Sequence, residues 1–187
     1  MAIRKILPVY TVLTCKNGSG SVSPEGFIEV TEGEDTTFTF SPNANNYLAS
    51  VLVDSTDVTS EVVNNTYTLH NVHSNHHLQI NFERVHYTIT ATANQNGSIT
   101  PNGEIDVLAG SNLSLAITPD EGYQIASVVV DQIESINLVN NLTFTFNNIT
   151  RSHTITVSFV EEPTQYYEIT AIYHEGGTII PEGTVSI

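Results

Sequence analysis

The feature that most constrains this chain is a segment that occurs three times. The segment that begins at Tyr10 returns at Tyr87, 77 residues later, and again at Tyr167, a further 80 residues on. Such a tandem array of one small module is typical of a spacer, a scaffold or a display protein, and not of an enzyme. The third copy is cut off at Ile187, about a quarter of the way through the unit.

Each copy contains the same two turn signals. Pro-x-Gly occurs at residues 24–26, 101–103 and 181–183, where proline presets φ and glycine accepts the left-handed conformation. A second glycine precedes each of these turns, at Gly20, Gly97 and Gly177. We expect these three glycines at the tip of a hairpin, where a positive φ suits glycine alone.

The repeat length predicts four parts: an N-terminal docking arm at residues 1–9, repeat domains at 10–85 and 86–162, and a partial repeat domain at 163–187. The second half of the unit also recurs, and we pair Tyr47 with Tyr123 as core or rim anchors of their repeats. Each unit of about 77 residues is long enough for a small independent core. The linkers are short, so we expect the repeats to form a rod.

Apolar and polar residues alternate with a period of two, which predicts strands throughout. No segment shows a helical period over ten residues. In the second repeat we expect strands at residues 87–93, 97–100, 104–108, 112–118, 124–131, 142–146 and 153–160. Threonine on the opposite face is typical of half-exposed antiparallel strands. The fold class is therefore all-β, with each repeat a small β-sandwich or a β-grasp-like sheet.

These repeats resemble the divergent internalin-B-type B-repeat of bacterial surface proteins and of some phage structural proteins. The second copy reads YTITATANQNGSITPNG, LSLAITPDEGYQIASVVVD and LTFTFNNITRSHTITVSF in succession. The first copy departs at SPNANNYLASVLVD, where Asn46 replaces the glycine before Tyr47 and the loop has an extra residue. The resemblance covers residues 10–187. It implies a stalk, spacer or adhesion surface, and it brings no catalytic residues.

Composition narrows the function further. Five basic and twenty acidic residues give a formal charge of −15, and the lack of a basic patch argues against nucleic acid and anionic membranes as partners. No run of 18 apolar residues occurs, so we expect no membrane insertion. Cys15 is the single cysteine, which excludes an intrachain disulfide.

The N-terminus can be interpreted in two ways. Arg4 and Lys5 followed by an apolar run could imitate a signal that ends at Cys15. Cleavage there would remove the first strand of the repeat, so we favour a chain that keeps its N-terminus and was not exported by such a signal. The partner-docking residues that we predict in the arm are Ile3, Arg4, Lys5, Ile6 and Leu7.

Three groups of residues could carry chemistry, and we expect none of them to do so. His73 and His76 have metal-ligand spacing, but on a turn and strand their side chains point to opposite faces. Acidic groups such as Glu32, Glu34 and Asp35 lack the spacing of a known calcium loop. Cys15 is replaced in the other copies and is no nucleophile candidate. We therefore predict no catalytic residue, no metal and no cofactor.

Two functions remain. The first is a non-enzymatic structural or display protein on the surface of a bacteriophage virion, as a head decoration, fibre or tail-associated protein anchored by its N-terminal arm. The second is a segment of a bacterial cell-surface adhesin or stalk. The expected partners are other virion or surface proteins, which residues 1–9 and the incomplete third unit would contact. That unit exposes strand edges, so either the protein is longer, a partner completes the sheet, or its hairpin pairs with the second unit. A homo-oligomer and a ligand on a host surface remain open.

Overall fold

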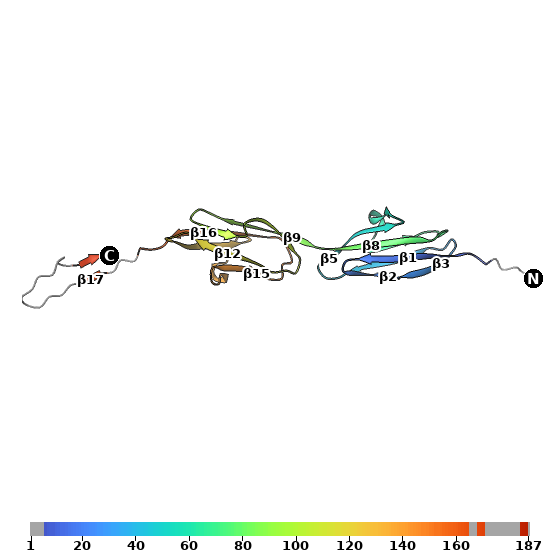
Figure 1. The fold of residues 1–187 in the computed structure, drawn as a ribbon, viewed down its shortest axis with the longest axis horizontal. Coiled ribbons are helices and arrows are strands. Elements are labelled where there is room, and N and C mark those ends of the chain that lie inside the picture. Colours follow the sequence, from blue (N-terminus) through green and yellow to red (C-terminus); the bar gives the residue numbers. More distant parts are fainter. Residues whose placement is uncertain (1–5, 165–167, 171–183, 187) are drawn as a thin grey trace, which may run out of the picture. The chain divides into compact units, whose positions relative to one another are not determined.

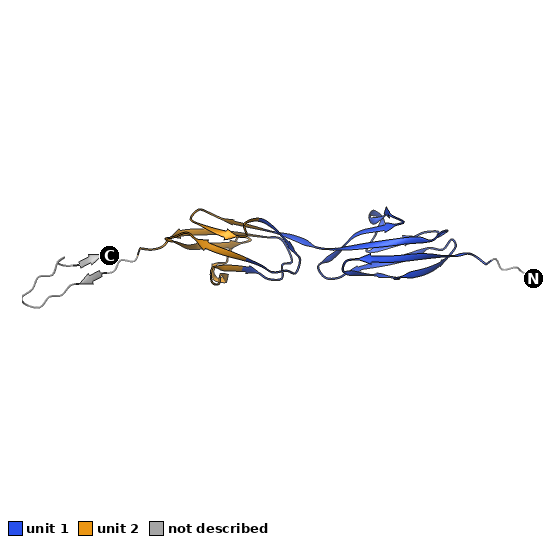
Figure 2. Ribbon diagram, viewed as in Figure 1, with its two compact units in different colours: residues 1–89, 104–114, 145–153 blue, residues 90–103, 115–144, 154–187 orange. Residues whose placement is uncertain are grey.

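The computed structural model of the chain describes residues 6–164, 168–170 and 184–186. These residues form short strands and two 3₁₀ turns, so the all-β prediction is confirmed (Figure 1). The chain divides into two compact units (Figure 2). The first takes the residues up to 89 together with 104–114 and 145–153, and the second takes 90–103, 115–144 and the residues from 154 on. The domain boundaries at 85 and 162, and the rod, stay predictions.

The first repeat consists of two sheets. Their strands are β1 (Val9–Asn17), β2 (Gly20–Ser23), β3 (Phe27–Thr31), β4 (Thr36–Pro42), β5 (Asn46–Val53), β6 (Thr56–Asp57), β7 (Thr66–Leu69) and β8 (His76–Arg84), with the 3₁₀ turn η1 (Thr59–Glu61). One sheet has the order β3-β1-β8-β5-β6 and the other has the order β2-β4-β7. Among the described strand pairs of this repeat, β1 and β8 alone run parallel.

The second repeat has the same topology. Its strands are β9 (His86–Ala93), β10 (Gly97–Thr100), β11 (Gly103–Leu108), β12 (Leu113–Pro119), β13 (Tyr123–Val130), β14 (Ile133–Glu134), β15 (Thr143–Phe146) and β16 (His153–Glu161), with η2 (Ile136–Leu138). The sheet orders are β11-β9-β16-β13-β14 and β10-β12-β15. All seven strands expected from the alternation are present. The two-residue strand β14 and the turn η2 were not predicted.

The core of the first repeat lies between its two sheets. It takes inward-facing residues from the five-stranded sheet, such as Val12 and Leu78, and from the three-stranded sheet, such as Phe38 and Phe40. Successive strand residues point to opposite faces, so alternation in sequence becomes one buried and one exposed face. A core between two sheets identifies the architecture as a sandwich, the first of the two predicted forms.

The strand register corrects our alignment of the two repeats. Leu48 pairs with Phe82, and Ile125 pairs with Phe159 in the same way. Asn46, not Tyr47, therefore corresponds to Tyr123, and the first copy has no extra loop residue. The left-handed position before the strand is Gly122 in the second repeat (φ 81°) and Asn45 in the first (φ 63°). Asparagine tolerates this conformation. Because the first repeat has Asn45 where the second has Gly122, the sequence alignment wrongly placed an extra residue in the loop before Tyr47.

The structure also corrects the role of Gly20 and Gly97. Neither has a positive φ, and each is the first residue of a strand. A Cβ at Gly20 would lie 2.7 Å from the ring of Phe82, and a Cβ at Gly97 would lie 2.5 Å from the ring of Phe159. These glycines are therefore needed for close packing against an aromatic ring. Gly177 lies outside the described residues.

Two short strands of the third copy are described, β17 (Glu168–Thr170) and β18 (Thr184–Ser186). Ile169 pairs with Val185 as Val12 pairs with Ile28 in the first repeat, so the register of the β1–β3 pair is repeated. In the two complete repeats the strand equivalent to β17 has a second neighbour, β8 or β16. Within the described residues β17 pairs with β18 alone.

Candidate functional site

The first candidate is the predicted docking arm. Ile3, Arg4 and Lys5 lie outside the described residues, whereas Ile6 and Leu7 are described and are both exposed. The arm ends earlier than residue 9, because Val9 already belongs to β1 and pairs with Thr31. Ile6 and Leu7 are thus an exposed apolar pair next to a folded repeat.

Pro8 joins the arm to the first repeat. Its carbonyl oxygen accepts a hydrogen bond of 2.8 Å from the N–H of Glu32. The carbonyl oxygen of Val85 accepts the equivalent bond from Ala109, also at 2.8 Å. Pro8 is thus the counterpart of the residue that precedes the second repeat, and the free part of the arm ends at residue 7.

The histidines form pairs with carboxylates. The three short pairs join His70 Nδ1 to Asp35 Oδ2 at 2.6 Å, His76 Nδ1 to Asp54 Oδ2 at 2.6 Å and His86 Nδ1 to Asp106 Oδ2 at 2.7 Å. His73 lies 3.5 Å from Glu32. His73 and His76 thus contact different carboxylates, as expected from their spacing. In the part of the chain that the structure describes, no three His, Cys, Asp or Glu side chains come together as a metal site.

The acidic loop after β3 is used within the fold. Asp35 Oδ1 accepts the backbone N–H of Asn71 at 2.8 Å. This bond, followed by the bond from His70, holds the pKa of Asp35 below its ordinary value. In the second repeat Asn112 accepts the N–H of Asn148 at the same distance. An amide oxygen can therefore accept the same backbone hydrogen bond, and the charge at Asp35 is a feature of the first repeat.

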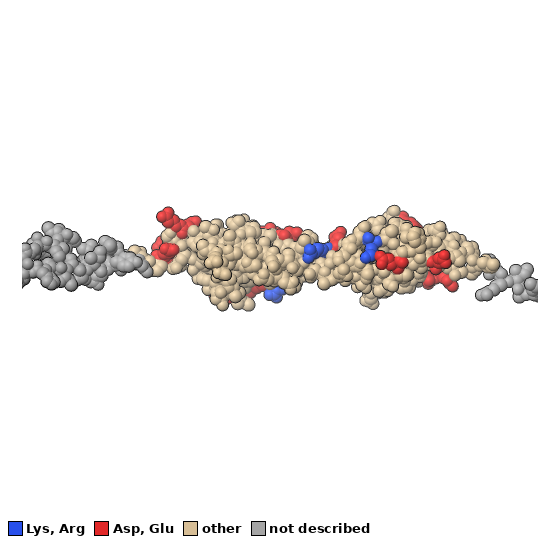
Figure 3. Space-filling model, turned by 60° about the horizontal axis from the view of Figure 1, so that its bottom comes forward, with Lys and Arg blue, Asp and Glu red and all other residues tan. Residues whose placement is uncertain are grey.

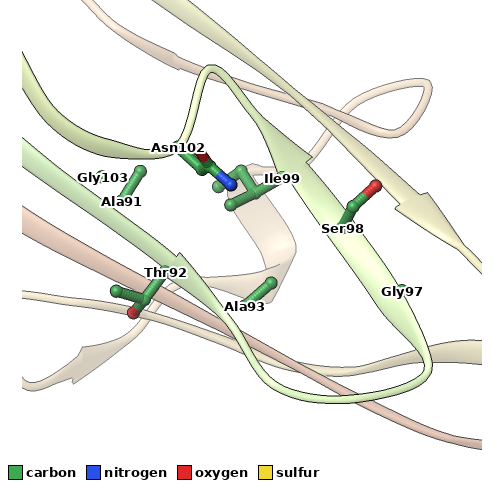
Figure 4. Close-up of a pocket in the computed structure, with 8 residues that line it drawn as sticks. All are labelled: Ala91, Thr92, Ala93, Gly97, Ser98, Ile99, Asn102 and Gly103. Atoms are coloured by element: carbon green, nitrogen blue, oxygen red, sulfur yellow. The ribbon is translucent and has the colours of Figure 1, made fainter.

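A shallow hollow of about 350 Å³ lies between β9 and β10 of the second repeat (Figure 4). Ala91, Ala93 and Ile99 point into it, whereas Thr92 and Ser98 point away. The hollow is present because two positions that carry larger side chains in the first repeat are alanine in the second. The counterpart of Ala91 is Thr14, whose hydroxyl accepts the N–H of Gly26 at 2.7 Å, and the counterpart of Ala93 is Lys16.

The side chains that line the hollow are small, apolar or neutral polar groups. Its lining has backbone groups, two hydroxyls and the amide of Asn102, and it has no titratable side chain. Cys15, the chain's single thiol, is free and exposed on β1. A nucleophile needs a neighbouring base or a lowered pKa, and no described hydrogen bond supplies a base to this thiol.

One group of exposed residues was missed by sequence reasoning. Four aliphatic side chains on β14 and on the segment from β14 to β15 of the second repeat are exposed: Ile133, Ile136, Leu138 and Leu142. The residues 77 positions earlier are Thr56, Thr59, Glu61 and Asn65. A gap-free alignment of the two copies would have found this difference.

Charge is spread over the described surface without a basic cluster. Acidic side chains are scattered over the face shown in Figure 3, and few basic ones interrupt them. No helix in the described ranges has the length and apolar character that crossing a membrane requires.

Comparison with known families identifies the module. Residues 87–163 match the family model of the divergent InlB B-repeat domain. The second repeat is a divergent InlB B-repeat. The match confirms, for the second repeat, the resemblance drawn from the sequence, and it spans nearly all of the segment from β9 to β16. Searches among curated proteins and among solved structures found no match. The B-repeat family is one of surface and structural repeat modules and is not an enzyme family.

Proposed function

We propose that this chain is a non-enzymatic structural and display protein on the surface of a bacteriophage particle, attached by residues 1–7. The observation that supports it best is the pair of B-repeat sandwiches, preceded by the exposed apolar residues Ile6 and Leu7. The described part of the two repeats contains no cluster of catalytic side chains. A folded repeat of this kind suits display, because it can hold an attached group at a distance from the particle surface.

The charge distribution suits the same role. A formal charge of −15 favours solubility and limits non-specific adsorption. Within the described residues β17 pairs with β18 alone, whereas β1 pairs with both β3 and β8. We propose that the third copy is a second point of contact, where a strand from another structural protein pairs with β17 by β-augmentation.

The attachment is tested by a chain that lacks residues 1–7. This deletion keeps Pro8 and its bond to Glu32, so the first repeat stays intact. Purified particles would be labelled with gold-coupled antibody against the second repeat. We expect labelling with the full chain and its loss with the deletion. The double substitution Ile6→Ser and Leu7→Ser should act in the same way. Ser21→Ala, on the exposed face of β2, is the matched control.

Labelling that survives the deletion would refute attachment by the arm. An absence of label on particles, with label on intact bacterial cells, would favour the second candidate, a segment of a cell-surface adhesin or stalk. That candidate is supported by the family itself, because its model takes its name from an internalin repeat.

A further inference from the structure

The segment that joins the two sheets of the second repeat exposes an unusual amount of apolar surface. Ile133 is 69% exposed, Ile136 38%, Leu138 63% and Leu142 51%. They lie within ten residues, on β14, η2 and the following turn. We refer to these four side chains as the edge patch. Figure 2 shows the turn that contains η2 standing out from the strands of the second unit.

The fold does not require the edge patch. The first repeat builds the same segment, with β6, η1 and the same turn, from Thr56, Thr59, Glu61 and Asn65. Both segments hold the same internal bonds. The N–H of Val58 and that of Ser135 donate to the carbonyl oxygens of Val51 and Val128, respectively. At these four positions the second repeat therefore carries aliphatic residues that the first repeat does not share.

A single exchange explains how the second repeat can carry an apolar residue on η2. In the first repeat Asp57 accepts from the hydroxyl of Thr59, and this hydroxyl accepts the N–H of Val51 at 2.9 Å. In the second repeat the longer side chain of Glu134 reaches the N–H of Val128 directly, at 3.1 Å. A hydroxyl at position 136 is then not needed to accept this N–H, so isoleucine can occupy the position that Thr59 has in the first repeat.

Leu142 is held in a conformation that disfavours it. Its φ is 56°, in the left-handed region, where the counterpart Asn65 has φ 57°. The turn needs this conformation, because the carbonyl oxygen of Leu142 accepts the N–H of Ile117 at 2.7 Å. Asparagine is tolerated there and leucine is disfavoured. Half of the Leu142 side chain is exposed, so packing within the repeat does little to offset this unfavourable backbone conformation.

The edge patch lies where the sandwich is open. β14 is the outermost strand of the five-stranded sheet, and β15 is the outermost strand of the three-stranded sheet. Proteins usually protect such edges with charged residues, as the first repeat does with Asp57 and Glu61. Exposed clusters of aliphatic side chains at such a place mark contacts with other proteins.

We propose that the edge patch is a self-association surface, on which the edge patch of a second copy of this chain docks. Charge supports this occupant. No charged residue occurs at positions 135–150, and the Oε1 atom of Glu134 is engaged by three backbone N–H groups. Two copies that each carry −15 meet with least repulsion at such an uncharged face.

The number of copies follows from the sequence. Of the two repeats that the structure describes in full, the second carries the edge patch, since its counterpart positions in the first repeat are polar. A patch that pairs with itself forms a closed, two-fold contact, which ends at two copies. The complex is therefore a dimer and not an open filament. This inference stands apart from attachment by residues 1–7, and it can be tested with purified protein alone.

The test is sedimentation velocity of the full chain over a range of concentrations. We expect a monomer–dimer equilibrium that becomes stronger with added salt, because salt screens like-charge repulsion and leaves apolar contact in place. Leu138→Glu and Leu142→Asn introduce the residues of the first repeat on the same backbone. Each should weaken the dimer by roughly tenfold or more.

Leu142→Asn has a second readout that separates loss of the contact from misfolding. Measured at concentrations where the chain is monomeric, it should raise the unfolding temperature, because asparagine suits the φ of 56°. A variant that weakens the dimer and stabilises the monomer cannot have lost its fold. Phe27→Glu is the matched control. Phe27 is 79% exposed on the first repeat, where the second repeat has Glu104.

Three outcomes would overturn the proposal. The first is a monomer at every concentration. The second is a dimer that Leu138→Glu and Leu142→Asn leave unchanged, or that Phe27→Glu weakens equally. The third is assembly beyond two copies, which would exclude a patch that pairs with itself.

Discussion

At the scale of single residues, glycine has two separate functions in this chain. Gly103 and Gly122 have positive φ values and serve turns. Gly20 and Gly97 serve packing, since each leaves space for the ring of a phenylalanine. Sequence reasoning cannot tell these functions apart, because both appear as a glycine next to a predicted turn.

The packing function predicts a clear cost at Gly20. Gly20→Ala would place a methyl group 2.7 Å from the ring of Phe82, and such overpacking should destabilise the chain by about 1–3 kcal/mol. Urea denaturation would measure this loss. Ser21→Ala, one residue later on the exposed face of β2, should stay within about 0.5 kcal/mol of the unsubstituted chain. Equal effects at the two positions would contradict the close contact.

The charge at Asp35 predicts a dependence on pH. Hydrogen bonds from Asn71 and His70 lower its pKa in the folded chain, whereas the unfolded value is about 3.9. A depressed folded pKa contributes stability above the unfolded pKa, and this contribution is lost as pH falls through the folded pKa.

Asp35→Asn, which copies Asn112, should remove that contribution. We expect the unsubstituted chain to have the higher urea midpoint at pH 6, and the difference to shrink as pH falls below about 4. Glu29→Gln, on the exposed face of β3, is the control for loss of one negative charge. A difference that is constant between pH 6 and pH 3 would show that the Asp35 charge has no such role.

At the scale of elements, the two hairpins next to the Pro-x-Gly turns differ in one internal bond. The Thr14 hydroxyl accepts the N–H of Gly26 in the first repeat, whereas Ala91 leaves the hollow of Figure 4 in the second. A buried, satisfied hydrogen bond contributes about 0.5–1.5 kcal/mol, and a donor left unsatisfied costs about 1–3 kcal/mol.

Exchange of these two residues should therefore have opposite effects. Thr14→Val keeps the volume and removes the acceptor, and we expect a loss of about 1–3 kcal/mol. Ala91→Thr supplies the missing acceptor next to Gly103, and we expect a gain of about 0.5–1.5 kcal/mol. Thermal unfolding of each variant measures both. A loss on Ala91→Thr would show that the hollow does not accept the larger side chain.

At the scale of the whole molecule, net charge is the dominant property. Twenty acidic and only five basic residues leave an excess of negative charge, which repels itself in any compact form. Added salt screens this repulsion. We expect the unfolding temperature to rise by roughly 2–4 °C between low and physiological salt, the equivalent of about 1 kcal/mol for a chain of this size. The measurement is thermal unfolding at a monomeric concentration.

A matched variant tests the origin of this rise. Glu32→Ala with Asp35→Asn introduces the residues of the second repeat, Ala109 and Asn112, and removes two negative charges. Its response to salt should be smaller than that of the unsubstituted chain. A fall in unfolding temperature with salt would mean that attractive pairs, such as His70 with Asp35, outweigh the repulsion.

The sequence by itself determined the modules. Alternation with a period of two gave the strands of the second repeat, because a half-buried strand must place apolar residues on one side. The recurring glycine and proline residues gave the turns. It also gave the family, since these features are the family's own pattern. It did not give β14 or η2, because a two-residue strand and a single 3₁₀ turn are too short for a period.

Only the tertiary structure decided the roles that depend on neighbours far along the chain. It assigned Gly20 to packing because Phe82, 62 residues later, lies above it. It placed Asn45 in the position of Gly122, since strand register and not residue type defines the equivalence. It also showed that Ile133, Ile136, Leu138 and Leu142 face solvent. The sequence alone does not distinguish an aliphatic residue in the core from one on the surface. Its burial depends on the residues that the fold places around it.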